Sequence, residues 1–183
     1  NLVELTAAYG AIANNGVWHA PTTIRRLTDA EACTGGAVDQ CRPAGNPQQT
    51  SAPGRRIATV AQAQTLQQLL RAVVQRGTGT PAYLGGPEGG KTGTTNDAMD
   101  AWFAGYQSDV VAVAWMGFDK PKSLGDRETG GGLALPMWIR YMKTALNGVP
   151  ESTRQVPAGV AQQDGDWTIP AFVPFFGRTS TLD

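Results

Sequence analysis

The sequence predicts an α+β fold in which an antiparallel sheet is flanked by helices. Two apolar runs, 101–106 and 110–116, are joined by three polar residues, a length that suits a β-hairpin. Segments with helical periodicity precede and follow this hairpin. Because both runs are apolar at successive positions, we expect helices to cover both faces of the sheet.

The first predicted helix lies at the start of the chain. Near-helical spacing separates Leu2, Leu5, Tyr9 and Ile12. The Asn-Asn-Gly sequence at 14–16 then favours the left-handed backbone conformation that ends many helices. After this helix, residues 22–27 are β-prone and predict a strand. Residues 29–56 carry Gly, Pro, Asn and Gln without a period, which predicts an irregular insertion.

Two more helices are predicted on either side of the hairpin. One runs from about 60 to 76, with Thr59 as its N-cap and Gly77 as its end. Another starts near Pro136 and stops at 147–148. Each has an apolar stripe expected to be buried: Leu66, Leu69, Leu70, Val73 and Val74 in the former, and Leu135, Trp138, Ile139, Met142 and Leu146 in the latter. Residues 1–148 are therefore expected to form the folded part, and 149–183 an extended tail.

Composition narrows the classes of function. Among 183 residues, 15 basic side chains balance 15 acidic ones, and no charge run indicates a nucleic-acid partner. No apolar stretch approaches the roughly 20 residues needed to cross a bilayer, so a membrane anchor is expected outside this chain. Cys33 and Cys41 are candidates for a disulfide, with two free thiols as the alternative. With His19 as the only histidine, the sequence predicts no metal site.

The unusual residues concentrate at 85–97, where two interpretations compete. Residues 85–92 satisfy the G-x-x-x-x-G-K-T pattern of a phosphate-binding loop. Such a loop needs a buried strand before it and a helix after it. A Gly- and Thr-rich stretch precedes it here and a β-prone Thr-Thr pair follows, so a nucleotide-binding domain is the weaker alternative.

The stronger interpretation centres on Lys91-Thr92-Gly93, the K-T-G element of serine acyl-transfer enzymes. Lys91 can present a positive charge to a substrate carboxylate. It can also lower the cost of placing a hydroxyl proton nearby. Gly93 lets a peptide approach the strand and pair with its backbone. Thr92 and Thr94, two positions apart, are expected on one face, with hydroxyls able to bind a terminal carboxylate.

The surroundings of this element resemble class A penicillin-binding proteins in the same order along the chain. The matching segments are AAYGAIANNG at 7–16, RGTGT at 76–80, KTGTTND at 91–97, DAWFAGY at 100–106, WMGFD at 115–119, ETGG at 128–131 and ALPMW at 134–138. The resemblance covers residues 1 to about 148 and implies an incomplete part of a β-lactamase/transpeptidase-like fold. It also implies a peptidoglycan D,D-transpeptidase that needs no cofactor, works at the periplasmic face of the inner membrane and binds stem peptides and β-lactams.

In that family two other elements, S-x-x-K with the nucleophile and S-x-N, precede K-T-G, and this chain has neither. By resemblance, Lys91 and Thr94 would be catalytic and Thr92, Gly93 and Thr95 would bind substrate, the Thr94 N–H forming half of an oxyanion hole. The nucleophile would come from an upstream part of the same protein. A non-catalytic binding fragment is the remaining alternative.

One expectation follows for the structure. In the family, a helical region that mostly precedes residue 1 covers one face of the sheet. We therefore expect either a second polypeptide or a large exposed apolar patch beside Lys91, and we do not expect 91–95 to be buried on both faces.

Overall fold

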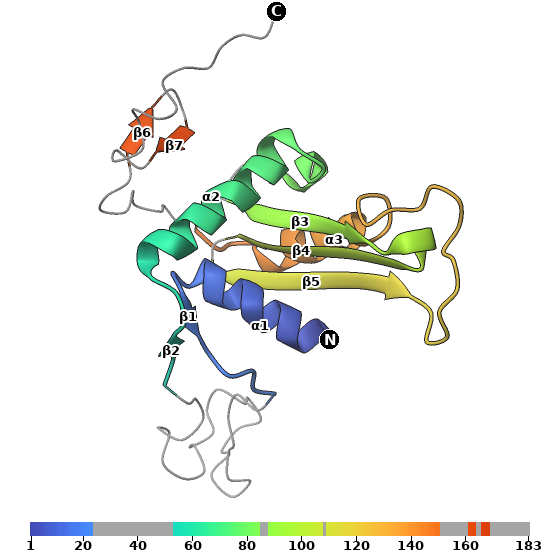
Figure 1. Ribbon diagram of the computed structural model, residues 1–183, viewed down its shortest axis with the longest axis horizontal. Coiled ribbons are helices and arrows are strands. Elements are labelled where there is room, and N and C mark those ends of the chain that lie inside the picture. Colours follow the sequence, from blue (N-terminus) through green and yellow to red (C-terminus); the bar gives the residue numbers. More distant parts are fainter. Residues whose placement is uncertain (24–52, 85–87, 108, 151–160, 164–165, 169–183) are drawn as a thin grey trace, which may run out of the picture.

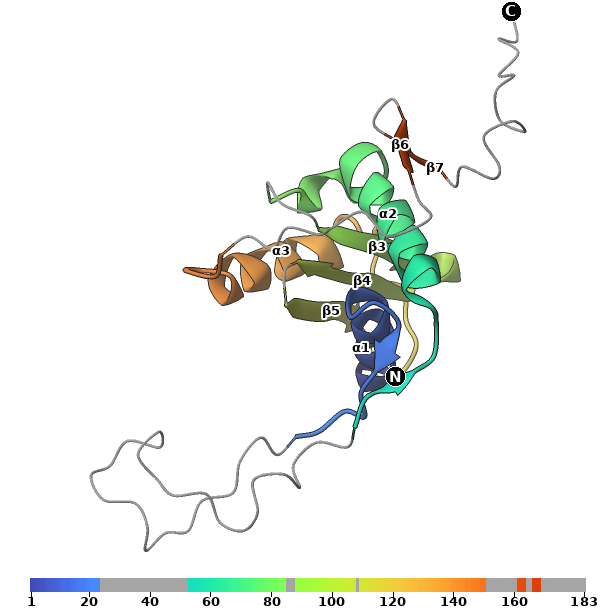
Figure 2. The ribbon, with the colours of Figure 1, turned by 90° about the vertical axis from the view of Figure 1, so that its left-hand side faces the viewer.

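A computed structural model describes residues 1–23, 53–84, 88–107, 109–150, 161–163 and 166–168 of the chain. A three-stranded sheet lies between one helix on one face, α3 (Ala134–Ala145), and two helices on the other (Figures 1 and 2). The two are α1 (Leu2–Ala13), which packs on the far side of the sheet from α3, and α2 (Val60–Arg76), which crosses near one end of the sheet. This arrangement confirms the predicted α+β class.

The sheet has the order β3-β4-β5 and is antiparallel throughout. Its strands are β3 (Gly89–Thr94), β4 (Asp100–Gln107) and β5 (Val110–Gly117). The β4–β5 pairing confirms the predicted hairpin, and the K-T-G segment is the third strand, paired with β4. Lys91 lies opposite Ala104, and Gly93 lies opposite Trp102.

The face covered by α3 holds the main core. Phe103, Leu135, Trp138 and Met142 are buried there. The rings of Phe103 and Trp138 meet edge to face with their centroids 4.9 Å apart, and the indole Nε1 of Trp138 donates to the Ala112 carbonyl at 3.1 Å. Each large apolar side chain buried in this way contributes about 1.5–3 kcal/mol. The predicted stripe of the last helix is confirmed, although the helix begins at Ala134, two residues before Pro136.

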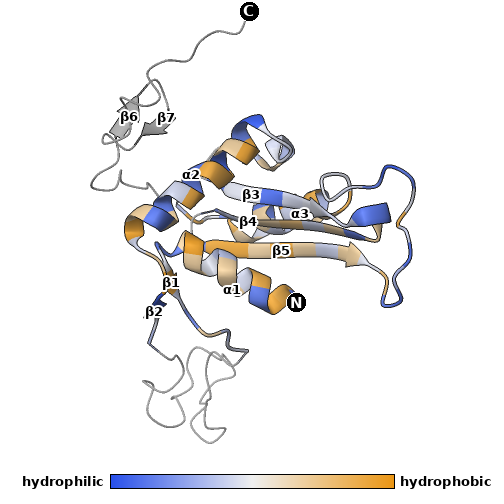
Figure 3. Cartoon of the chain, in the orientation of Figure 1, coloured by the Kyte–Doolittle hydropathy of each residue, from blue (hydrophilic) through white to orange (hydrophobic). Residues whose placement is uncertain are grey.

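The helix α1 begins and ends as its sequence predicts. Asn1 and Glu4 form a capping box, and Asn15 and Gly16 follow the helix with positive φ angles of 51° and 85°. Although α1 is apolar, Ala11 is its only buried residue. Hydrophobic positions lie along α1 and α2 as well as in the sheet (Figure 3).

The predicted stripe of α2 is wrong in part. Thr59 caps the helix and Gly77 ends it as expected, but Leu66 is 44% exposed and Leu69 is 61% exposed. The buried line runs instead through Ala63, Gln67 and Val74. Gln67 is buried because its amide donates to the Ile12 carbonyl at 2.5 Å. This carbonyl lies near the end of α1, where the last carbonyls of a helix have no N–H partner within the helix.

Several expectations fall where the structure describes little or nothing. Residues 24–27 of the predicted strand, the two cysteines and most of the insertion lie outside the described residues, so their predictions stay open. The structure adds two pairings that we did not expect. They are β1 (Val17–Trp18) with β2 (Arg55–Arg56), and β6 (Ala161–Gln163) with β7 (Asp166–Thr168).

The K-T-G strand is not buried on both faces. Lys91, Thr94 and Thr95 are exposed, which agrees with the expectation from the sequence. On α1 and α2, the helices of the face that carries Lys91, the exposed apolar side chains include Leu2, Val3, Val60, Leu66 and Leu69. None of the helices among the described residues is long and apolar enough to cross a membrane.

Candidate active-site strand

The strand β3 forms one edge of the three-stranded sheet. The Thr95 N–H donates to the Asp100 carbonyl at 3.1 Å, which fixes the phase of the ladder between β3 and β4. Residues of an antiparallel strand alternate between bonding to the partner and facing away from it. The N–H and C=O groups of Thr92 and Thr94 therefore face the free edge.

The two faces of β3 can be assigned from neighbours on β4. Tyr106, opposite Gly89, donates its hydroxyl to the Gln67 carbonyl of α2, so Gly89, Lys91 and Gly93 share the face of α1 and α2. Phe103, opposite Thr92, packs on Trp138 of α3. Thr92 and Thr94 consequently share the α3 face, as their spacing predicted.

The Lys91 ammonium lies at the free edge of β3. Its Nζ donates to the Thr92 carbonyl at 2.8 Å and lies 3.4 Å from the Thr92 Oγ1. The side chain is exposed, so the charge stays accessible to a ligand. A cation, an outward carbonyl and an outward N–H thus stand along one strand edge.

Two loops that are distant in sequence hold the threonine hydroxyls. Thr78, just after α2, has its Oγ1 3.0 Å from that of Thr92. The Gly130 N–H donates to the Thr94 Oγ1 at 3.0 Å. Sequence reasoning placed Thr78 and Gly130 in matching segments but assigned neither to the site, because no local pattern reports a contact between distant loops.

Gly130 lies directly on the sheet backbone. A Cβ at this position would clash with the carbonyl oxygens of Gly93 and Trp102. The loop therefore rests on β3 at the K-T-G glycine, and only a residue without a side chain allows that approach.

Thr95 has a different environment from the other predicted site residues. Its hydroxyl accepts from the Asp100 N–H at 2.8 Å, across the turn that contains η5 (Asn96–Ala98). The Asp100 Oδ1 in turn accepts from the Trp115 Nε1 at 2.8 Å. The Thr95 side chain is thus engaged in closing the turn between β3 and β4.

The nucleotide alternative is wrong. The residues that fit the phosphate-loop pattern from Gly89 onward form a strand, and the chain continues through a short turn into β4. Within the described segment 88–107, no α-helix follows Lys91, although a phosphate-binding loop requires one there. In the part of the chain that the structure describes, no three His, Cys, Asp or Glu side chains cluster to hold a metal.

Comparisons with known proteins agree with this geometry. Residues 1–137 match the family model "Penicillin binding protein transpeptidase domain". Penicillin-binding protein 1A of Pseudomonas aeruginosa is 47% identical over 110 residues, which are 59% of this chain and 13% of that protein. Penicillin-binding protein 1A of Neisseria lactamica is 34% identical over 167 residues, which are 90% of this chain and 20% of that protein.

Solved structures show the same likeness. The crystal structure of penicillin-binding protein 1A from Haemophilus influenzae matches with a TM-score of 0.72 at 25% identity, over 87% of this chain and 28% of that one. Penicillin-binding protein PonA1 from Mycobacterium tuberculosis matches with a TM-score of 0.68 at 23% identity, over 86% of this chain and 41% of that one. The chain spans a fifth or less of the length of these two curated relatives. It belongs to the penicillin-binding protein transpeptidase domain family and corresponds to part of a class A member.

Proposed function

We propose that this chain supplies the substrate-binding edge strand of a peptidoglycan D,D-transpeptidase. The observation that carries the proposal is the outer edge of β3. There the Lys91 ammonium, the Thr92 carbonyl and the Thr94 N–H face away from the sheet. A stem peptide, or a β-lactam in its place, would bind as an added strand through main-chain hydrogen bonds.

Each predicted residue has a role in this proposal. Lys91 attracts the substrate carboxylate and stabilises the charge that develops during acyl transfer. The Thr94 hydroxyl accepts from Gly130, so its own proton is available to a carboxylate, and its N–H serves as an oxyanion donor. Thr92 shares one hydroxyl hydrogen bond with Thr78, which leaves one proton of the pair for the ligand. Gly93 keeps the strand accessible, and Thr95 fixes its end through Asp100.

The chemistry needs a nucleophilic serine, and no serine of this sequence stands in an S-x-x-K element. We propose that an upstream part of the same protein carries it and covers the α1 and α2 face of the sheet. The serine oxygen would attack the carbonyl of the penultimate D-alanine and expel the terminal one. An amine of a neighbouring stem peptide would then release the acyl group, at the periplasmic face of the inner membrane, with the anchor outside this chain. No cofactor enters these steps.

The decisive experiment is acylation by a fluorescent penicillin. In the complete protein that contains this chain, Lys91→Ala should slow labelling about 100-fold or more, because an electrostatic group at the developing charge is lost. Lys120→Ala, which removes an exposed lysine after β5, should leave the rate unchanged. Equal rates for Lys91→Ala and the parent would refute the proposed role of the strand.

A second measurement tests whether the nucleophile lies outside this chain. The 183-residue chain alone should form no covalent penicillin adduct in intact-mass analysis, because the nucleophile is expected elsewhere. A stoichiometric mass increase on this polypeptide would show that it holds a nucleophile of its own.

A further inference from the structure

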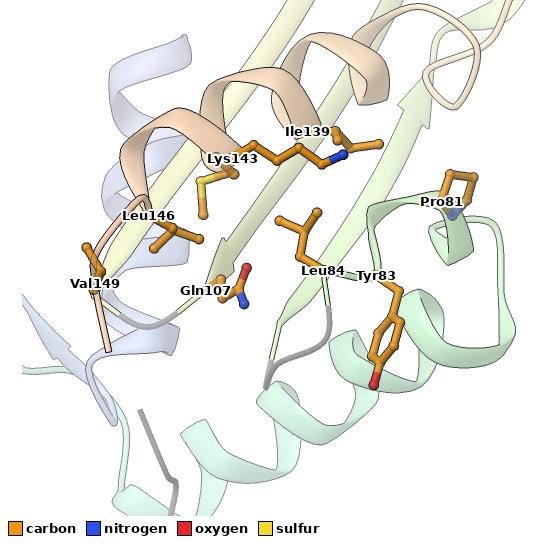
Figure 4. A pocket seen from close by; sticks show the side chains of 9 residues that line it. Pro81, Tyr83, Leu84, Gln107, Ile139, Lys143, Leu146 and Val149 are labelled. Atoms are coloured by element: carbon orange, nitrogen blue, oxygen red, sulfur yellow. The ribbon is translucent and has the colours of Figure 1, made fainter. Parts of the chain in front are cut away.

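A pocket of about 490 Å³ lies behind the sheet, between α3, β4 and the segment around η4 (Thr80–Ala82). We propose that it binds a small N-acyl amino acid, a ligand with an apolar acyl chain, one amide and a carboxylate. Its volume is within the range of small-molecule sites, and its lining combines apolar side chains with two polar groups. Figure 4 shows these side chains from close by.

The apolar part of the lining comes from two separate segments. Leu84 lies on one side, and Ile139 and Leu146 of α3 lie on the other (Figure 4). Met142 of α3 also lines the pocket. Met142 is fully buried, whereas the other three are half-buried. An acyl chain laid between them would remove further apolar surface from water, at about 25 cal/mol per Å².

The polar group at the inner end of the pocket is Gln107, the last residue of β4. It is only 6% exposed, and its amide points into the pocket between Leu84 and Leu146 (Figure 4). Its Oε1 is buried and accepts no hydrogen bond from any described residue. A buried carbonyl oxygen without a donor is costly, so the inner end of the pocket offers an acceptor that a ligand N–H would satisfy.

A buried carboxylate directly precedes β3. If the register of the β3–β4 ladder continues one residue beyond the Gly89–Tyr106 pair, Glu88 lies opposite Gln107. Its Oε1 accepts from the Leu84 N–H at 2.5 Å, while its buried Oε2 has no partner among the described residues. A half-turn of the Gln107 amide exchanges the positions of its oxygen and its NH₂ group, so either one can face the pocket. A ligand amide suits either orientation, because it carries both a donor and an acceptor.

The second polar group is Lys143 of α3, which stands at the outer part of the pocket near Ile139 (Figure 4). Its side chain is exposed, and it forms no ion pair within the described part of the chain. A carboxylate at the far end of the ligand would complement this charge. The order of groups along the pocket thus selects an amphipathic anion with an internal amide.

This pocket is independent of the proposed transpeptidase edge. Gln107 shares the α3 face with Phe103, four residues earlier on the same strand, whereas Lys91 is on the face of α1 and α2. Occupancy of one site does not require the other. A failure of the ligand experiment therefore leaves the role of β3 intact, and the reverse also holds.

N-octanoylglycine is the probe, and N-octanoylglycinamide is its neutral counterpart. In a ligand-observed NMR titration of the complete protein, we expect saturable binding of N-octanoylglycine with a Kd on the order of 1 mM or tighter, given its size. Lys143→Met, which keeps an apolar stem, should weaken its binding about tenfold and leave binding of the neutral amide unchanged. Gln107→Leu, which fills similar space without polar atoms, should weaken both ligands about fivefold.

Two control variants make the result specific. Lys120→Met removes a lysine outside the pocket, and Lys91→Ala removes the charge of the strand edge, so neither should change the Kd. Absence of saturable binding would overturn the proposal. So would equal losses in Lys143→Met and Lys120→Met, or equal affinity of the parent protein for the acid and the neutral amide.

Discussion

The two faces of the sheet differ in how far this chain covers them. On the α3 face, Phe103 and Trp138 are almost inaccessible, with Trp138 only 1% exposed. On the opposite face, α1 buries only Ala11, and α2 leaves Leu66 and Leu69 exposed. The α3 face therefore holds the larger apolar core, and the helices of the other face present apolar side chains that a further surface can bury.

The difference bears on how the site is built. The α3 face supports β3 from behind, through Gly130 and Thr78, with residues of this chain alone. On the face that carries α1 and α2, the Lys91 side chain is exposed. We infer that contacts on the α3 face position the strand, and that the proposed upstream part would bring the nucleophile to the α1 and α2 face beside Lys91.

The largest expected effect contrasts one residue from each face. Trp138→Ala should lower the free energy of unfolding by about 3–5 kcal/mol, because it leaves a cavity in a packed core. Leu69→Ala should change it by about 0.5 kcal/mol or less, because the side chain is already exposed. Urea unfolding of the chain measures both. Similar losses for the two variants would mean that the faces are equally packed.

An intermediate effect is expected where the covered face meets the K-T-G strand. Gly130→Ala should lower the free energy of unfolding by about 1–3 kcal/mol, because its methyl group would clash with the backbone of Gly93 and Trp102. Gly132→Ala is the matched control, since the nearest atom to its added Cβ is 3.6 Å away. In the complete protein only Gly130→Ala should also slow penicillin labelling. If Gly130→Ala left the free energy of unfolding and the labelling rate unchanged, the loop would not hold β3.

The smallest effect concerns Tyr9, on the partly covered face. Burial raises the pKa of its phenol above the ordinary value of 10.0. The folded state therefore retains the proton at pH values where the unfolded state loses it, so stability is full below pH 10.0 and falls as the pH rises through the folded pKa. Tyr9→Phe should remove this part of the decline. Parallel unfolding midpoints at pH 9 and above, for parent and variant, would contradict it.

Local patterns accounted for most of the secondary structure. The 3.6-residue period, the N-cap Thr59 and the Asn15-Gly16 pair after α1 are local features of the sequence, and α1 and α2 form where these signals predict. The two apolar runs likewise became β4 and β5, because strand length and a short polar connection suffice for a hairpin. The K-T-G residues were found for the same reason, since they are contiguous.

What the period alone could not predict is which apolar face becomes buried. In α2 the sequence offers a stripe through Leu66 and Leu69, yet Gln67 is the residue turned inward. The choice depends on the carbonyls of Ile12 and Ala13 at the end of α1, more than 50 residues away in sequence, which accept from the Gln67 amide. In α2, long-range hydrogen bonds therefore decide which side of the helix is buried, in place of the apolar periodicity.

The sequence by itself determined that this chain has an antiparallel sheet between helices, and that Lys91, Thr92 and Gly93 lie on a strand beside the hairpin, because period and contiguity are local properties. Only the tertiary structure decided that Thr78 and Gly130 hold the threonine hydroxyls. It also decided that Gln107 and Lys143 share a pocket with Leu84. These contacts join segments far apart in the chain, and their geometry follows from how the helices pack on the sheet, which no local pattern encodes.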